Sequence, residues 1–136
     1  PPAPEVVWLS GDRKTAVSDM LGHDYPAMRL RYWCKSPRSA WVLEEIGKDQ
    51  PITVGIIVEK SYIENLRVLV YRENRGGEVA SASFTDQFNR VSLDEDSRLD
   101  QRIDGISGAT LSVRALTRLA NVALFLHDES GCMNDT

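Results

Sequence analysis

The sequence predicts a single domain of the α+β class, in which an antiparallel sheet packs against helices. Two observations carry this prediction. Residues 51–71 contain two apolar strands joined by a short polar turn, which is typical of an antiparallel hairpin. Residues 109–127 carry apolar side chains at helical spacing and form the longest predicted helix. With 136 residues, the chain is long enough to form a hydrophobic core without help from metal ions or disulfides.

Residues 1–50 are predicted to form an N-terminal extension, with a short helix and strands, that packs on the domain. Residues 1–11 are rich in proline, which predicts an extended and weakly anchored N-terminus. In residues 12–22, three apolar side chains share a helical face ahead of a glycine, so we expect a short amphipathic helix. Residues 28–34 alternate with the period of a strand. Residues 40–46 suit either a strand or a helix, and the nearby Gly and Pro favour the strand.

The clearest strand pattern lies in residues 52–59, and a second strand is predicted over residues 63–71. In both, apolar residues recur at every second position, as in a strand with one buried face. The following residues, 72–78, form a polar loop that contains glycines. Residues 83–90 favour a helical turn, and the charged residues 92–101 are typical of a surface loop.

The C-terminal helix is predicted over residues 109–127, because apolar residues at helical spacing give it a wide apolar face. Together with the hairpin it defines the core of the domain, residues 51–128, and residues 129–136 are expected to form a flexible tail.

Two cysteines lie far apart in the sequence. Cys34 and Cys132 either form a disulfide, as in proteins of oxidising compartments, or leave Cys34 as a buried thiol on the apolar face of its strand.

Composition argues against several classes of function. The 16 Lys and Arg residues against 20 Asp and Glu give a net charge of −4, without a basic cluster, so nucleic-acid binding is not expected. No apolar run reaches the ~18 residues of a membrane span. The histidines and cysteines lack the spacing of metal ligands, so no metal site is expected. The chain begins with Pro-Pro-Ala-Pro, which suggests that a targeting segment has been removed.

The segment that carries chemistry is residues 103–112, directly before the C-terminal helix, with the sequence Ile-Asp-Gly-Ile-Ser-Gly-Ala-Thr-Leu-Ser. It places glycines, hydroxyls and small side chains at a helix N-terminus. There the first backbone N–H groups lack intrahelical partners and the helix dipole favours an anion. Glycines also let a ligand approach the backbone closely. On spacing alone, the commoner interpretation is that Ser107 or Thr110 caps the helix.

Residues 104–110, Asp-Gly-Ile-Ser-Gly-Ala-Thr, match the flavinylation motif D-G-x-[ST]-G-A-T. By this motif the chain resembles the FMN-binding domains of the flavoprotein subunits of the sodium-translocating NADH:quinone reductase and of the Rnf complex. The resemblance implies that FMN is bound covalently through a phosphoester bond to Thr110. It also implies that Asp104 and Gly108 belong to the signal read by a flavin transferase, which uses FAD as donor outside the cytoplasm. The other residues of the motif region that the resemblance assigns to cofactor binding are Gly105, Ser107, Ala109 and Leu111.

The resemblance covers roughly residues 51–127. The family places a hairpin ahead of a loop that often reads E-T-P-G, and here Glu73 and Gly76 match the first and last positions of that loop. Asn and Arg replace the Thr and Pro between them. A Phe-x-x-Gln-Phe segment at residues 84–88 also fits the family order between loop and motif. The resemblance therefore implies that Glu73 and Gly76 contribute to the cofactor site.

The function implied by this resemblance is an electron-transfer flavoprotein on the periplasmic or extracytoplasmic side of a bacterial membrane. Such a domain is an electron carrier or a redox subunit rather than a stand-alone enzyme. Its partners would be the flavin transferase, a redox partner protein and a membrane-bound partner complex. If Thr110 is flavinylated, the natural precursor is expected to carry an export signal or membrane anchor ahead of Pro1.

Two alternatives remain at the level of sequence. The domain can bind FMN non-covalently, as a sensor or reductase module, or it can be a non-redox interaction domain that has lost the cofactor.

Several side chains are also open to two interpretations. Tyr32, Trp33 and Trp41 can stack on a flavin ring, although packing in the core is commoner. Arg72 and Arg75 can stabilise a reduced, anionic flavin, although a solvated loop is the favoured interpretation.

Overall fold

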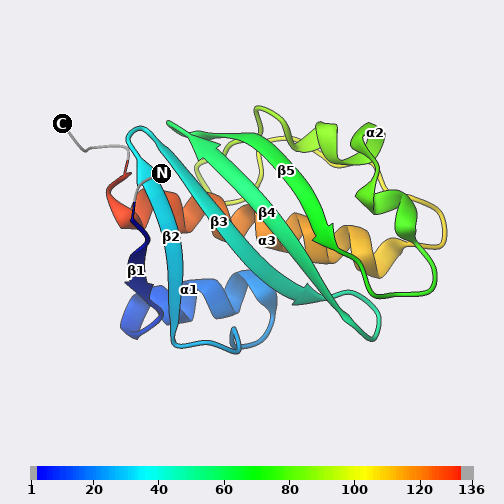
Figure 1. Ribbon diagram of the computed structural model, residues 1–136, viewed down its shortest axis with the longest axis horizontal. Helices are drawn as coiled ribbons and strands as arrows, with labels where there is room; N and C mark the ends of the chain where they lie inside the picture. Colours follow the sequence, from blue (N-terminus) through cyan, green and yellow to red (C-terminus); the bar gives the residue numbers. More distant parts are fainter. Residues whose placement is uncertain (1–2, 133–136) are drawn as a thin grey trace.

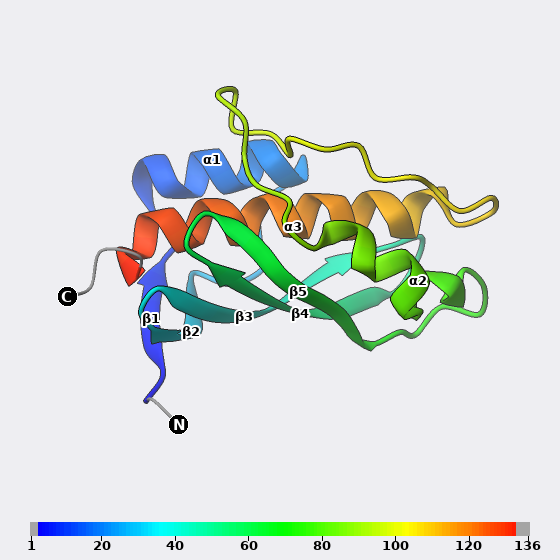
Figure 2. The ribbon, with the colours of Figure 1, turned by 90° about the horizontal axis from the view of Figure 1, so that it is seen from above.

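The computed structural model describes residues 3–132, which form a five-stranded antiparallel sheet with helices on one face (Figures 1 and 2). The strands follow one another in the sheet in their order along the chain, so each pairs with its neighbour in sequence. The predicted α+β class is therefore confirmed. The strands are β1 (Glu5–Trp8), β2 (Arg29–Lys35), β3 (Arg38–Ile46), β4 (Pro51–Glu59) and β5 (Tyr62–Val70).

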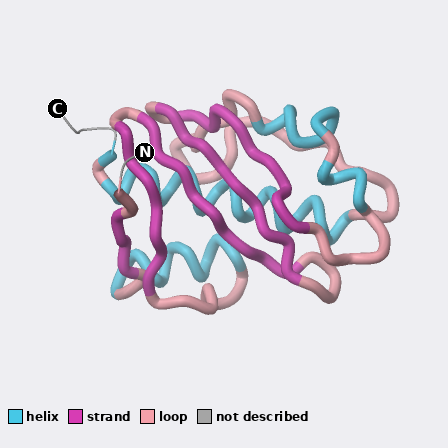
Figure 3. Tube along the Cα trace, in the orientation of Figure 1, coloured by secondary structure: helices cyan, strands magenta, loops and turns pink. Residues whose placement is uncertain are grey.

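One long helix crosses the inner face of this sheet, and a shorter helix lies beside it (Figures 2 and 3). The buried side chains of the long helix contact those of β3 and β4, which alternate strictly between buried and less buried positions. None of the helices in the described part of the chain is both long and apolar enough to span a membrane. The helices are α1 (Gly11–Leu21), α2 (Ala82–Thr85) and α3 (Thr110–Ser130), with short 3₁₀ turns η1 (Gly77–Ala80) and η2 (Asp86–Phe88).

The N-terminus is anchored more firmly than the sequence predicts. Residues 5–8 are extended, as expected, but they pair with β2 and form the edge strand of the sheet. The Leu9 N–H then donates to the Met28 carbonyl at 2.8 Å, and the side chains of Val7 and Leu9 are buried. The pairing is hard to recognise in the sequence, because so short a strand has a single buried side chain, that of Val7.

The C-terminal helix ends three residues later than predicted, and it begins one residue later, at Thr110. It continues to Ser130 and ends at Gly131, which has a φ of 74° and so adopts the left-handed conformation of a helix C-cap. Cys132 follows directly and forms a disulfide with Cys34 on β2, which settles the two alternatives for these cysteines. Residues 129–132 therefore belong to the fold. The remainder of the predicted tail, residues 133–136, lies outside the described residues.

Candidate functional site

A cavity of about 740 Å³ opens at the end of the molecule where α3 begins. Three segments meet there: the β3–β4 turn, the loop after β5, and the first turn of α3 (Figure 1). Its size falls within the range of about 300–1,000 Å³ that is typical of ligand pockets. The cavity is lined by Lys48, Asp49, Gln50, Arg72, Glu73, Asn74, Arg75, Gly108, Ala109, Thr110, Leu111 and Ser112.

The N-terminus of α3 is uncapped. Ala109 occupies the cap position, and no side chain bonds to the first turn, so the interpretation that Ser107 or Thr110 caps the helix is wrong. Within residues 3–132, no hydrogen bond is made by the backbone N–H groups of Thr110, Leu111 or Ser112. These free donors and the positive end of the helix dipole face the cavity, which suits an anion. The exposed Thr110 side chain lies at the same point.

The loop after β5 packs directly against the start of α3 through Gly76. Its φ is 82°, and an added Cβ would lie 2.7 Å from the Tyr71 hydroxyl and 3.2 Å from Ala109 Cβ. A larger residue would push the loop away from the helix. Gly108 also has a φ of 82°, so the turn into α3 requires a residue that tolerates the left-handed region. Gly105 has neither a positive φ nor a close neighbour.

Glu73 joins the loop after β5 to the β3–β4 turn. Its carboxylate Oε2 accepts hydrogen bonds from the backbone N–H groups of Lys48 and Asp49, both at 3.0 Å. Both of those residues line the cavity, so Glu73 shapes one wall by fixing the turn. Charge-assisted bonds to backbone N–H groups are among the stronger hydrogen bonds in proteins.

A small polar cluster connects the segments that border the cavity. The Tyr71 hydroxyl donates to the Arg75 carbonyl and lies 3.2 Å from the Oγ of Ser112, which is buried. Ser112 in turn packs against Gly47, where an added Cβ would lie 3.1 Å from its Oγ. The cluster thus holds all three cavity segments together.

The two arginines of the site are placed differently. Arg72 is bound to the strands, because its Nη1 donates to the Pro51 carbonyl at 2.7 Å and to Thr53 Oγ1 at 3.1 Å. Its guanidinium also lies 3.7 Å from the Glu44 carboxylate. Arg75 is exposed and lines the cavity. Both side chains therefore lie where they can contribute positive charge to a bound anion.

The predicted site residues divide into three groups. Five line the cavity: Glu73, Gly108, Ala109, Thr110 and Leu111. Gly76 packs behind the cavity wall. The last three, Asp104, Gly105 and Ser107, lie on the exposed loop that leads into α3, outside the cavity lining.

The structure adds residues that sequence reasoning missed, chiefly the β3–β4 turn at residues 48–50 together with Tyr71 and Ser112. The turn carries no recognisable motif, because its role depends on a contact with Glu73 more than twenty positions away. Ser112 lies two residues beyond the flavinylation motif, and only its burial against Tyr71 reveals its place in the site.

The aromatic residues considered for flavin stacking lie elsewhere. Tyr32 and Trp41 are buried and stack on each other, with ring centroids 4.5 Å apart. Trp33 does not line the cavity either. Packing within the fold is therefore the correct interpretation for Tyr32 and Trp41. Within residues 3–132, no three His, Cys, Asp or Glu side chains gather closely enough to hold a metal ion.

A comparison with solved structures shows that other proteins share this fold. The crystal structure of Shewanella oneidensis NqrC is similar to the structure of this chain, with a TM-score of 0.71 over 97% of this chain and 82% of that chain. The sequence identity is 14%, so this likeness is one of fold. A comparison with curated protein sequences gave no match.

The family comparison covers the segments that build the cavity. The FMN-binding domain model matches residues 47–124, which include the β3–β4 turn, the loop after β5 and the start of α3. These residues make up more than half of the chain. The chain therefore belongs to the FMN-binding domain family.

Proposed function

We propose that this protein is an electron-transfer flavoprotein domain that carries FMN covalently on Thr110. The observation that carries the proposal is the exposed Thr110 at the uncapped N-terminus of α3, inside the cavity and at the last position of the flavinylation motif. Neither the Thr110 side chain nor the Ser107 side chain is engaged as a helix cap, so the hydroxyl of Thr110 is available for esterification.

The residues present fit a phosphate group. A phosphodiester on Thr110 would lie beside the three free N–H groups of the first helical turn, and Arg75 and Lys48 line the same cavity. Helix N-termini and nearby cations both stabilise such an anion. The volume of about 740 Å³ leaves room for the rest of a cofactor beyond the phosphate.

The attachment is a transfer from FAD, catalysed by a flavin transferase. The hydroxyl oxygen of Thr110 forms a bond to the phosphorus of the FMN half of FAD, while the diphosphate bond of FAD breaks. AMP leaves with the bridging oxygen, and the threonine loses its proton. No electron is gained or lost, so FAD and protein become FMN-bearing protein, AMP and a proton.

Covalent attachment suits a carrier that works in dilute surroundings, since the cofactor cannot dissociate. When bound, FMN supplies the electron-transfer chemistry. The protein binds the phosphate at the start of α3, and Glu73 and Tyr71 fix the two loops that border the cavity. Electrons would pass from a donor to an acceptor protein, and a membrane-bound complex is a candidate for either partner.

We place this function in the periplasm or on the extracytoplasmic face of a bacterial membrane. The Cys34–Cys132 disulfide supports this location, because disulfides persist in oxidising compartments and are rare in the cytosol. The same location would expose the chain to a flavin transferase that works outside the cytoplasm.

The test is intact mass after co-expression with a flavin transferase. Wild-type protein should gain the mass of FMN less one water and keep its yellow colour after denaturation. Thr110→Ala should lose both, whereas Thr15→Ala, an exposed threonine on α1, should keep both. Colourless wild-type protein after such co-expression would overturn the proposal. Colour that is released on denaturation would instead show non-covalent FMN.

A further inference from the structure

The loop that carries the first half of the flavinylation motif is attached to the rest of the protein at one hydrogen-bonded point. Within residues 3–132, the segment 101–108 makes hydrogen bonds to another part of the chain only through Gln87. Asp104 N–H donates to Gln87 Oε1 at 2.7 Å, and Gln87 Nε2 donates to the Asp104 carbonyl at 3.3 Å. The side-chain amide therefore pairs with both backbone groups of one residue.

Gln87 projects from a segment that is packed into the core through two phenylalanines. It lies in η2, directly after α2, and this short helical segment is held down by Phe84 and Phe88, whose rings pack edge to face with centroids 6.0 Å apart. Phe88 is fully buried. Figures 1 and 2 show α2 beside the loop that leads into α3. The amide is thus a fixed point against which the loop is positioned.

The pairing fixes the backbone of Asp104 and leaves its side chain exposed, with no hydrogen-bond partner among the described residues. A glutamine is suited to this task because its amide offers a donor and an acceptor side by side, whereas Glu only accepts and Leu does neither. The carboxylate is thereby displayed to solvent six positions before Thr110.

We propose that Gln87 is a positioning residue for covalent flavinylation: its amide clamps the Asp104 backbone so that the flavin transferase meets a pre-ordered Asp104 carboxylate. The inference rests on the proposed function. A transferase that binds an ordered loop avoids the entropy cost of ordering it on binding. Gln87 therefore acts through Asp104 and does not touch the reacting atoms.

The first test measures the rate at which purified flavin transferase adds FMN from FAD to the apo-protein. The increase in intact mass over time is the readout. Gln87→Leu should lower kcat/KM for the apo-protein about ten-fold, the effect of losing two neutral hydrogen bonds. The matched control is Gln101→Leu, an exposed glutamine of the same loop that makes no hydrogen bond within the described residues. It should react at the wild-type rate, and all assays run well below the melting temperature of each variant.

Two further readouts separate positioning from general folding. Hydrogen exchange of the Asp104 amide should accelerate in Gln87→Leu and stay unchanged in Gln101→Leu, since Gln87 accepts from that amide. In a double-mutant cycle, Gln87→Leu should lower the rate less than two-fold once Asp104→Asn is present. Both changes disrupt the same interaction, which is recognition of the Asp104 carboxylate by the flavin transferase.

The outcomes distinguish the two proposals. Wild-type protein that is never flavinylated overturns the proposed function. If wild type is flavinylated and Gln87→Leu reacts equally fast, Gln87 does not position Asp104 for the transferase. That result overturns the role of Gln87 and leaves the proposed function standing. Additive losses in the double-mutant cycle would also overturn it, because Gln87 would then act independently of Asp104.

Discussion

The two ends of α3 are built in opposite ways. At its N-terminal end the helix is uncapped, its first N–H groups are free, and a cavity opens beside exposed Thr110. At its C-terminal end Gly131 caps the helix, and the next residue, Cys132, is tied to Cys34 on the sheet. Polar groups that lack partners within the protein are available to bind ligands, whereas polar groups that are paired within the protein contribute to stability. The comparison therefore predicts that function and stability respond to different substitutions.

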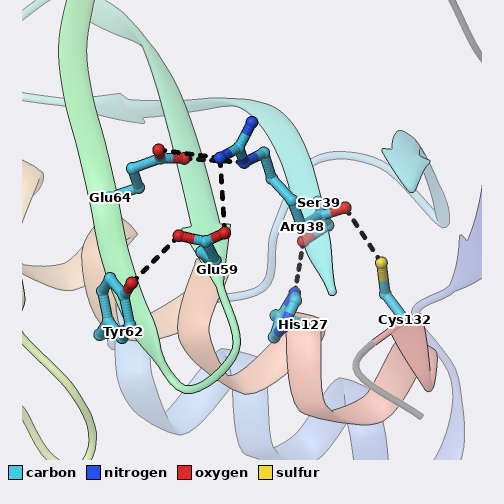
Figure 4. A network of polar contacts seen from close by, with 7 residues as sticks. All are labelled: Arg38, Ser39, Glu59, Tyr62, Glu64, His127 and Cys132. Atoms are coloured by element: carbon cyan, nitrogen blue, oxygen red, sulfur yellow. Dashed lines mark hydrogen bonds and ion pairs between the residues drawn. The ribbon is translucent and has the colours of Figure 1, made fainter. Parts of the chain in front are cut away.

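The closed end contains a buried relay of hydrogen bonds, and Figure 4 shows its contact between Ser39 and His127. Trp41 Nε1–H, which can only donate, bonds to Ser39 Oγ at 2.7 Å, and Ser39 Oγ in turn shares a hydrogen bond of 2.6 Å with His127 Nδ1. Cys132 Sγ lies 3.1 Å from the Arg38 carbonyl, and Arg38 pairs with Glu64 on β5. These contacts join the C-terminal end of α3 to the start of β3, the central strand of the sheet.

Removal of the disulfide should have the largest effect on stability. Replacing both cysteines with serine frees a loop of 98 residues in the unfolded chain. We expect the free energy of unfolding to fall by about 3–5 kcal/mol. Urea denaturation of the variant, and of wild type with and without reductant, measures this. Flavinylation at a temperature where the variant is folded should be unchanged, and a loss of flavinylation there would contradict the separation of the two ends.

Ser39→Ala should have the next largest effect. The substitution leaves both the buried Trp41 N–H and the buried His127 ring without their partner. Each unsatisfied group costs about 1–3 kcal/mol, so we expect a loss of about 2 kcal/mol or more. Chemical denaturation provides the measurement, and Ser83→Ala, an exposed serine on α2, provides the control. Equal stability of the two variants would show that the relay contributes nothing.

Gly76→Ala should affect both properties, because Gly76 joins the open end to the fold. The left-handed backbone and the overlap with the Tyr71 hydroxyl predict a loss of about 1–2 kcal/mol together with slower FMN incorporation. Gly77→Ala is the matched control, since Gly77 has no positive φ and no atom within 4 Å of an added Cβ. If the two variants behave alike, the packing of the loop against α3 does not matter for the site.

Acidification should weaken the closed end. Burial lowers the pKa of His127, and the Lys60 carbonyl and Asp128 offset only part of this effect. Its contribution to stability is present above the ordinary histidine pKa of about 6.5 and is lost as pH falls below that value. Exposed His23 acts in the opposite sense. Hydrogen bonds to the Asp24 carbonyl and to Glu45 raise its pKa, so its contribution to the stability of the fold is lost as pH rises. Melting temperatures of His23→Gln, in which the opposing histidine is removed, test this between pH 5 and 8, and a flat profile for that variant contradicts it.

Thr110→Ala should have the smallest effect on stability, although it abolishes the proposed FMN linkage. The side chain is exposed and does not cap α3, so the free energy of unfolding of the apo-protein should change by less than about 0.5 kcal/mol. Thermal or urea unfolding of apo-protein gives the value. A loss near 1 kcal/mol, typical of a removed N-cap, would mean that Thr110 also serves as a cap in solution.

The fold and the core of the candidate site could be predicted from local patterns. Strand alternation indicated the hairpin, helical spacing indicated α3, and the seven-residue motif pointed to Thr110. Such patterns are visible because they depend on residues that are close in the chain. The short strand β1 escaped prediction, since its pairing with β2 depends on residues more than twenty positions away.

The sequence by itself therefore determined the α+β class, the motif and its place before a helix. Only the tertiary structure decided that the helix start is uncapped, that Glu73 fixes the turn at Lys48, that Gln87 holds Asp104, and that Ser39 meets His127. The physical reason is that a hydrogen bond depends on where two groups lie in space. Folding brings those groups together from distant parts of the chain, and periodicity along the sequence carries no record of which pairs will meet.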